Sequence, residues 1–135
     1  MKSICEIDKF GTQSYWLDDK LHREDGPAIQ NIDGDKYWYL NGDLHREDGP
    51  AIEFSNGTKA WYLNDKRHRE AGPAIEWANG HKEWYINGLR HREDGPAIEG
   101  ANGYKYYYYK NKLISCDTNK QFLLEVRKIK LICFS

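Results

Sequence analysis

An internal repeat is the feature that most constrains what this chain can fold into. The block His-Arg-Glu-Asp-Gly-Pro-Ala-Ile starts at residues 22, 45 and 91, and again at 68 with Ala71 in place of the aspartate, so the period is 23 residues. Glycines keep the same interval: Gly11, Gly34, Gly57, Gly80 and Gly103. A fixed period of this length predicts a repeat protein in which each unit packs against its neighbours. The chain holds four full units and a further half unit.

Each unit carries two turn signals. The first set is Asp33-Gly34, Asn56-Gly57, Asn79-Gly80 and Asn102-Gly103. The second set is Asn41-Gly42 and Asn87-Gly88, with Asn64-Asp65 and Asp18-Asp19 as weaker versions. Such pairs favour two-residue hairpin turns, because both central residues need a positive φ. Two turns per unit leave two strands of roughly six to nine residues and no room for a helix.

Side-chain alternation assigns the aromatic residues to two faces. Trp38 and Leu40 share one face and Tyr39 points to the other, and the pattern returns at 61–63 and 84–86. We expect the next strand to add Ile52 and Phe54 to the tryptophan side, which makes that side the buried face. Proline recurs in these second strands at Pro27, Pro50, Pro73 and Pro96. Because proline cannot donate to a strand ladder, the strands should bend and the sheet should curve.

Composition limits the function classes. The net charge of -1 provides no global field for bulk nucleic acid or an anionic membrane, and no run of about 18 apolar residues predicts a membrane span. The cysteines Cys5, Cys116 and Cys133 are odd in number and lack Cys-x-x-Cys spacing, and residues 1–10 do not read as a signal peptide. We therefore expect a cytoplasmic protein without a required disulfide or cofactor.

The C-terminal segment departs from the repeat. It begins at Asp117, a candidate helix N-cap, and residues 118–134 carry apolar side chains at roughly helical spacing with basic residues between them. These apolar residues are Phe122, Leu123, Val126, Ile129 and Leu131. A repeat array needs a cover for its end, so we predict a helical lid on the last hairpin. A helix that binds a membrane surface or a partner is the alternative.

The sequence therefore predicts an all-β protein: an elongated, curved, single-layer antiparallel meander of β-hairpin repeats with a short C-terminal helical cap. We divide the chain into an N-terminal cap strand at 1–10, a repeat array at 11–113 and a capping segment at 114–135, which should be helical.

The repeat unit also resembles a known family. Its form, Gly-x-Lys-x-Trp-Tyr-Leu-Asn-Gly followed by His-Arg-Glu-Asp-Gly-Pro-Ala, is similar to a divergent MORN repeat over residues 11–113. Repeats with His-Arg-Glu-Asp-Gly-Pro-Ala are similar to those of phage, giant-virus and bacterial proteins. The resemblance implies a twisted single-layer sheet used for protein contacts or, in some members, for lipid binding.

Four His-Arg-Glu triplets are the candidate functional residues. Their histidines and arginines are His22, Arg23, His45, Arg46, His68, Arg69, His91 and Arg92. In one interpretation each arginine pairs with an acidic residue of the neighbouring repeat, forming a ladder that fixes register. In the other, the row binds an anionic, stackable ligand beside the aromatic residues. If the triplets are structural, the tyrosine face with Tyr39, Tyr62 and Tyr85 is the next candidate. The repeating lysines, beginning with Lys36, should shield strand edges.

The sequence favours binding over catalysis. Equivalent histidines of adjacent repeats should lie about 10 Å apart, too far to share one metal ion. Four near-identical triplets also lack the single differentiated site that catalysis needs. We expect a non-enzymatic module that captures a partner protein, as a virus-encoded inhibitor or antitoxin-like protein would in the host cytoplasm. The alternative is a sponge for a small anionic nucleotide signal held by histidine and arginine of adjacent repeats. A homo-oligomer could form through the sheet edge or the C-terminal segment.

Overall fold

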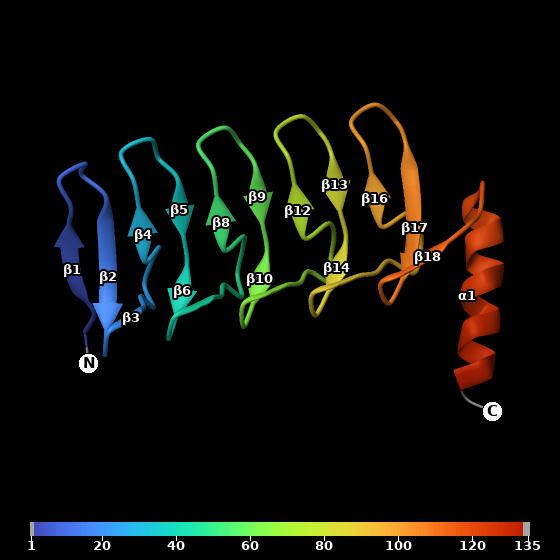
Figure 1. The fold of residues 1–135 in the computed structure, drawn as a ribbon, viewed down its shortest axis with the longest axis horizontal. Helices are drawn as coiled ribbons and strands as arrows, with labels where there is room; N and C mark the ends of the chain where they lie inside the picture. The colour runs from blue at the N-terminus through green and yellow to red at the C-terminus, as the bar shows by residue number, and fades with distance from the viewer. Residues whose placement is uncertain (1, 134–135) are drawn as a thin grey trace.

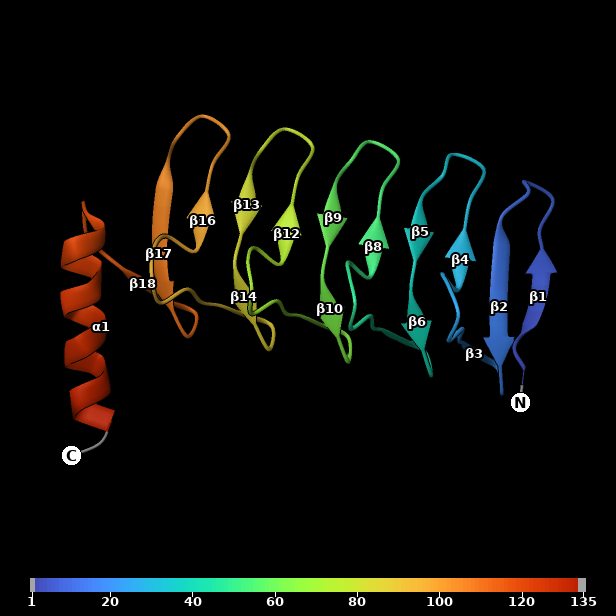
Figure 2. The same ribbon diagram turned by 180° about the vertical axis from the view of Figure 1, so that it is seen from behind.

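The protein is an elongated row of antiparallel hairpins that ends in one helix (Figure 1). The structure, a computed structural model, describes residues 2–133. Seen from behind, the N-terminal strand and the helix lie at opposite ends of the row (Figure 2). The arrangement confirms the predicted all-β, single-layer antiparallel architecture with a helical cap.

The main sheet has 12 strands. They are β1 (Ile4–Ile7), β2 (Gln13–Leu17), β3 (Lys20–Leu21), β4 (Ile29–Gln30), β5 (Lys36–Tyr37), β8 (Ile52–Glu53), β9 (Lys59–Ala60), β12 (Ile75–Glu76), β13 (Lys82–Glu83), β16 (Ile98–Glu99), β17 (Lys105–Tyr109) and β18 (Lys112–Ile114). All but β3 follow one another along the row, and β3 pairs with β2 beside this path. Three small hairpins extend from the main sheet: β6 (Tyr39–Leu40) with β7 (Asp43–Leu44), β10 (Tyr62–Leu63) with β11 (Lys66–Arg67), and β14 (Tyr85–Ile86) with β15 (Leu89–Arg90).

The repeat strands are shorter than the sequence predicts, because each long strand changes partner at its tryptophan. The Trp38 N–H donates to the Ala51 carbonyl at 2.8 Å, and the Trp38 carbonyl accepts from the His45 N–H at 3.0 Å. Ala51 follows Pro50, which has no N–H and cannot extend the ladder toward β6. The pairing therefore passes from the main sheet to the small hairpin.

The two sets of turns differ. In the small hairpins both central residues have a positive φ, as at Asn41 (51°) and Gly42 (87°), which confirms the predicted two-residue turns. At the other set only the glycine does, as at Gly34 (94°), and the Gly34 N–H donates to the Asn31 carbonyl at 3.2 Å. The prediction of two-residue turns there is wrong. The connection is a longer loop in which glycine takes the left-handed position.

One face of the array carries Tyr37, Tyr39, Tyr62 and Tyr85, and we call it the tyrosine face. It is the buried face of the array. Tyr37 is the register partner of Ile52, and its ring meets that of Phe54 edge-on at 5.9 Å. The buried cluster of this region is Ala60, Ala74, Ile75 and Tyr85, with Ile52 and Tyr62 packed against it. The predicted grouping of Ile52 and Phe54 with the tryptophans is therefore wrong, and Trp61 and Trp84 are half-buried.

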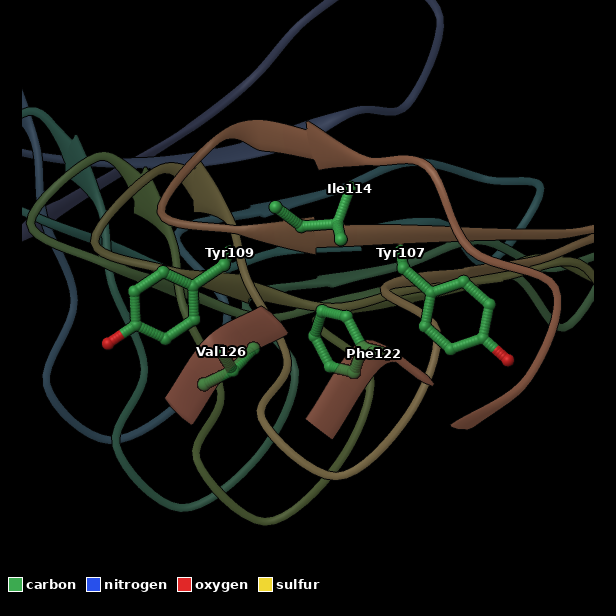
Figure 3. Close-up of a cluster of buried hydrophobic side chains, with 5 residues drawn as sticks. All are labelled: Tyr107, Tyr109, Ile114, Phe122 and Val126. Carbon is green, nitrogen blue, oxygen red and sulfur yellow. The ribbon is translucent and has the colours of Figure 1, made fainter. Parts of the chain in front are cut away.

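The helix α1 (Asn119–Cys133) covers the last hairpin, as predicted. Phe122 and Val126 pack on Tyr107, Tyr109 and Ile114 of β17 and β18 (Figure 3).

The N-cap prediction for this helix is wrong by one residue. The Thr118 Oγ1 accepts from the Gln121 N–H at 3.2 Å, so Thr118 caps the helix. Asp117 lies outside it and donates its N–H to the Gln121 Oε1 at 2.8 Å. Phe134, the last residue of the predicted helical segment, lies outside the described residues.

Candidate binding groove

The four triplet histidines join successive repeats. Each Nδ1 accepts a backbone N–H from the turn 19 residues ahead, at 3.0 Å for His22, His45 and His68 and 2.9 Å for His91. An accepting Nδ1 places the proton of a neutral ring on Nε2. That nitrogen lies 3.5–3.7 Å from the glutamate two residues on, beyond an ordinary hydrogen bond. Burial, the largest influence, lowers the pKa of His91 and favours its neutral form. These histidine rings therefore stabilise the packing of successive repeats.

The triplet arginines pair within their own repeat. Arg46 donates from Nε to the Asp48 carboxylate at 3.0 Å, and from Nη1 to the Pro50 carbonyl and to Glu53, both at 3.1 Å. Its guanidinium also stacks 3.9 Å from the centre of the Trp38 ring. The prediction that each arginine pairs with an acidic residue of the neighbouring repeat is wrong. The reason is the bend at Gly49-Pro50, which folds each chain segment back over its own tryptophan.

A glycine makes this arginine geometry possible. A Cβ at Gly49 would lie 3.0 Å from the Arg46 Cζ, and Gly26 and Gly95 have the same relation to Arg23 and Arg92. Any larger residue would push the guanidinium away. The glycine of the repeated block is thus explained by side-chain packing.

Two arginines depart from the full pattern, and each departure follows from a substitution. Arg69 stacks 3.8 Å from the Trp61 ring centre and bonds Glu76, but Ala71 stands where other repeats have the aspartate. Arg23 bonds Asp25 and stacks on Tyr15, but Gln30 stands where they have the glutamate.

Charges do alternate across the sheet, through lysine and glutamate. The register places each glutamate between lysines of the two flanking strands: Lys36, Glu53, Lys59, Glu76, Lys82, Glu99 and Lys105 follow in order. Lys36, Lys59 and Lys82 have register partners on both sides, so the prediction that they shield a strand edge is wrong. Lys105 has a register partner on one side, Glu99. The row is a cross-strand charge ladder that fixes register.

The return loops, defined as residues 22–27, 45–50, 68–73 and 91–96, enclose a series of pockets that we call the groove. One pocket of about 720 Å³ lies between the first two loops, with Trp38 and Leu40 on its floor. The next, of about 640 Å³, has Trp61 and Leu63, and a third, of about 710 Å³, has Trp84 and Ile86. The same apolar pair therefore recurs at each repeat.

The rims of the groove are acidic. Glu24, Glu47 and Glu70 have side chains 84–85% exposed, and Asp25 and Asp48 are 85% and 87% exposed. The hydrogen bond from Arg23 holds the pKa of Asp25 below its usual value, so this carboxylate is ionised at neutral pH. The guanidiniums, in contrast, lie deeper and are only 22–28% exposed. A molecule that enters the groove meets carboxylates first.

The tyrosines predicted as ligand contacts on the tyrosine face are partly or fully buried. Tyr39 and Tyr62 are half-buried, and Tyr85 is 5% exposed. The Tyr85 hydroxyl donates to Glu83 at 2.7 Å and accepts from the Arg90 Nε at 3.1 Å. Tyr85 therefore belongs to the core and is unsuited to ligand contact.

A buried polar cluster on this face was missed by the sequence reasoning. Glu83 is 9% exposed and contacts Tyr85, His81 (3.0 Å) and Arg90 (3.6 Å). Burial raises the pKa of Glu83, but these hydrogen bonds and the charge of Arg90 outweigh it, and the net pKa lies below the usual value. The signal in the sequence was the break in the repeat, since Ala60 stands at the equivalent position one unit earlier.

Comparisons with known proteins add no family. No protein-family model matches this chain, and no curated protein matches it significantly. Within residues 2–133, no cluster of three or more histidine, cysteine, aspartate or glutamate residues could hold a metal ion. The same part of the chain contains no helix with the length and apolar character needed to cross a membrane.

Proposed function

We propose that the protein is a non-enzymatic binding module that captures and sequesters a partner protein in the groove. The observation that carries the proposal is the recurrence of one pocket design along the array. Each pocket combines a half-buried tryptophan and an aliphatic residue on its floor with exposed charges at its rim. An apolar centre with a polar rim is the usual anatomy of a protein interface.

The groove suits a nucleotide less well. An anion would need free guanidinium donors, but Nε and Nη1 of Arg46 and Arg92 are already bonded within the repeat. The exposed carboxylates at the rim would also repel a phosphate. A nucleotide sponge is therefore the weaker proposal for this face.

A capture experiment with matched variants tests the proposal. Three proteins are immobilised after circular dichroism has shown that each of them folds. They are wild type, the double variant Leu40→Ser/Leu63→Ser and the control Phe54→Ser. The double variant removes apolar floor from two pockets, whereas Phe54 lies on the tyrosine face and is 37% exposed. We expect a protein retained by wild type and by the control to be lost from the double variant.

A second arm addresses the nucleotide alternative by a thermal-shift screen against cyclic and linear nucleotides. We expect no nucleotide to raise the melting temperature. The proposal of protein capture is overturned if every retained protein binds wild type and both variants equally, or if a nucleotide alone stabilises wild type.

A further inference from the structure

The groove has a surplus of negative charge. In the repeat of Arg46, the guanidinium bonds Asp48 and Glu53 but not Glu47. Glu53 also lies between the ladder lysines Lys36 and Lys59. The nearest ring nitrogen to Glu47 is the His45 Nε2 at 3.6 Å, which is beyond an ordinary hydrogen bond, and the Nδ1 of that ring accepts the Asn64 N–H. Glu47 is thus an exposed carboxylate without a cation of its own. Glu24 and Glu70 repeat this situation in the neighbouring units.

The pocket floors complement the charge of the rims. A lysine or arginine side chain has an apolar stem and a charged head, so its stem can pack on a tryptophan and an aliphatic residue while its head meets carboxylates. The pocket between the second and third return loops offers this combination, with Trp61 and Leu63 on the floor and Glu47, Asp48 and Glu70 at the rim. Arg46 and Arg69 also line this pocket, so its carboxylates exceed its guanidiniums by one. The pocket before it has the same construction, and the pocket after it differs in that its Glu93 is paired with Lys130 of α1 at 3.3 Å.

The spacing of the pockets fixes the form of the ligand. Two strands separate one repeat from the next, so successive pockets lie about 10 Å apart along the array. A chain in polyproline II conformation advances about 3.1 Å per residue with three residues per turn, so side chains three positions apart point the same way and lie about 9 Å from one another.

We infer that the groove recognises a segment of a partner protein in polyproline II conformation with lysine or arginine at every third position. This inference rests on the proposed function and adds the chemistry of the partner. Each basic side chain occupies one pocket, and the contacts along the array add up because they belong to one ligand.

Synthetic peptides test the spacing directly. The probe has nine residues with lysine at every third position, one for each of the three pockets, and proline or serine between. The control has the same composition with its three lysines adjacent. By isothermal titration at low salt, we expect the spaced peptide to bind at least about tenfold more tightly than the control. Its affinity should fall severalfold when sodium chloride is raised from about 50 mM to about 300 mM.

Charge variants locate the site. Glu47→Gln with Glu70→Gln should weaken the spaced peptide about tenfold, because the central pocket loses its two unpaired carboxylates. Glu125→Gln on α1 removes one negative charge outside the groove and should leave binding unchanged. Ala71→Asp restores the missing aspartate of the third loop and should tighten binding about two- to fivefold, a gain that misfolding cannot produce.

The outcomes separate this inference from the proposed function. Equal affinity for the two peptides, or no binding of either at millimolar concentration, overturns the basic-segment inference. If a protein captured by wild type is still lost from Leu40→Ser/Leu63→Ser, the groove remains a protein-binding site with another ligand chemistry. If the double variant retains that protein as well as wild type does, both proposals fail.

Discussion

The array and its C-terminal end are stabilised in different ways. Inside the array the residues with no exposed surface are alanines: Ala28, Ala51, Ala74 and Ala97. At the C-terminal end the fully buried residue is Phe122, seated between the helix and the last hairpin. A single layer has no second layer to cover large side chains, so the array adds hydrogen bonds, charge pairs and arginine stacked on tryptophan to its small apolar cluster around Ile75 and Tyr85. The cap instead concentrates its stability in one apolar cluster.

The largest effect should come from the cap. Phe122→Ala should lower the free energy of unfolding by about 3 to 5 kcal/mol, the range for deleting a large buried aromatic side chain. Urea denaturation followed by circular dichroism measures the loss. Leu124→Ala on the same helix is the control, since that side chain is 51% exposed and its removal should change stability by less than about 0.5 kcal/mol. Similar losses for the two variants would contradict the lid assignment.

A tryptophan of the array should matter less. Trp61 is half-buried, so Trp61→Ala should cost about 1.5 to 3 kcal/mol through lost packing and the lost stack with Arg69. The same denaturation experiment compares it with Phe122→Ala. A loss from Trp61→Ala that exceeds the loss at Phe122 would restore the tryptophan side as the main core.

The arginines of the return loops should contribute still less. Arg46→Ala should lower stability by about 0.5 to 2 kcal/mol, because a partly exposed guanidinium loses its aspartate, its glutamate and a carbonyl. Arg69→Ala should cost less, since Ala71 leaves that arginine without the aspartate. Chemical denaturation of both variants provides the comparison. An equal or larger loss at Arg69 would show that the aspartate contact adds nothing.

Stability should also depend on pH through His91. Its pKa in the folded protein is lowered from 6.5, chiefly by burial, so below about pH 6.5 the unfolded chain binds the proton more readily. The contribution of neutral His91 to the free energy of unfolding is fully present above about pH 6.5. It is lost as the pH falls through the lowered pKa that His91 has in the folded protein. Melting temperatures between about pH 5 and pH 8 should show this decline, and His91→Gln, which keeps an acceptor but does not titrate, should flatten it. An unchanged slope in the variant would assign the decline to other groups.

The smallest effect should come from reductant. Cys5, Cys116 and Cys133 are free thiols in the structure, so dithiothreitol should leave the melting temperature unchanged. A substantial fall would reveal a disulfide that contributes to stability.

The repeat allowed much of the fold to be predicted, because its period and turn residues are local signals. Asn41-Gly42 sufficed to place a small hairpin, and the apolar spacing around Phe122 and Val126 sufficed to place the helical lid. The burial of the two faces could not be predicted by alternation alone. Each strand changes partner at its tryptophan, so Ile52 faces Tyr37 and not Trp38. The acidic rims could not be predicted from the sequence either, because the partners of Arg46 depend on the bend at Gly49-Pro50.

The tryptophan side chains offer the most direct test of ligand binding in the groove. Trp38, Trp61 and Trp84 line its pockets, whereas Trp16 belongs to β2 and Trp77 is an exposed residue after β12. In a ¹⁵N-labelled sample, titration with the spaced lysine peptide should shift the indole N–H signals of the first three and leave those of Trp16 and Trp77 in place. Shifts confined to Trp16 and Trp77, or no shift in any of the five signals, would contradict the groove as the binding site.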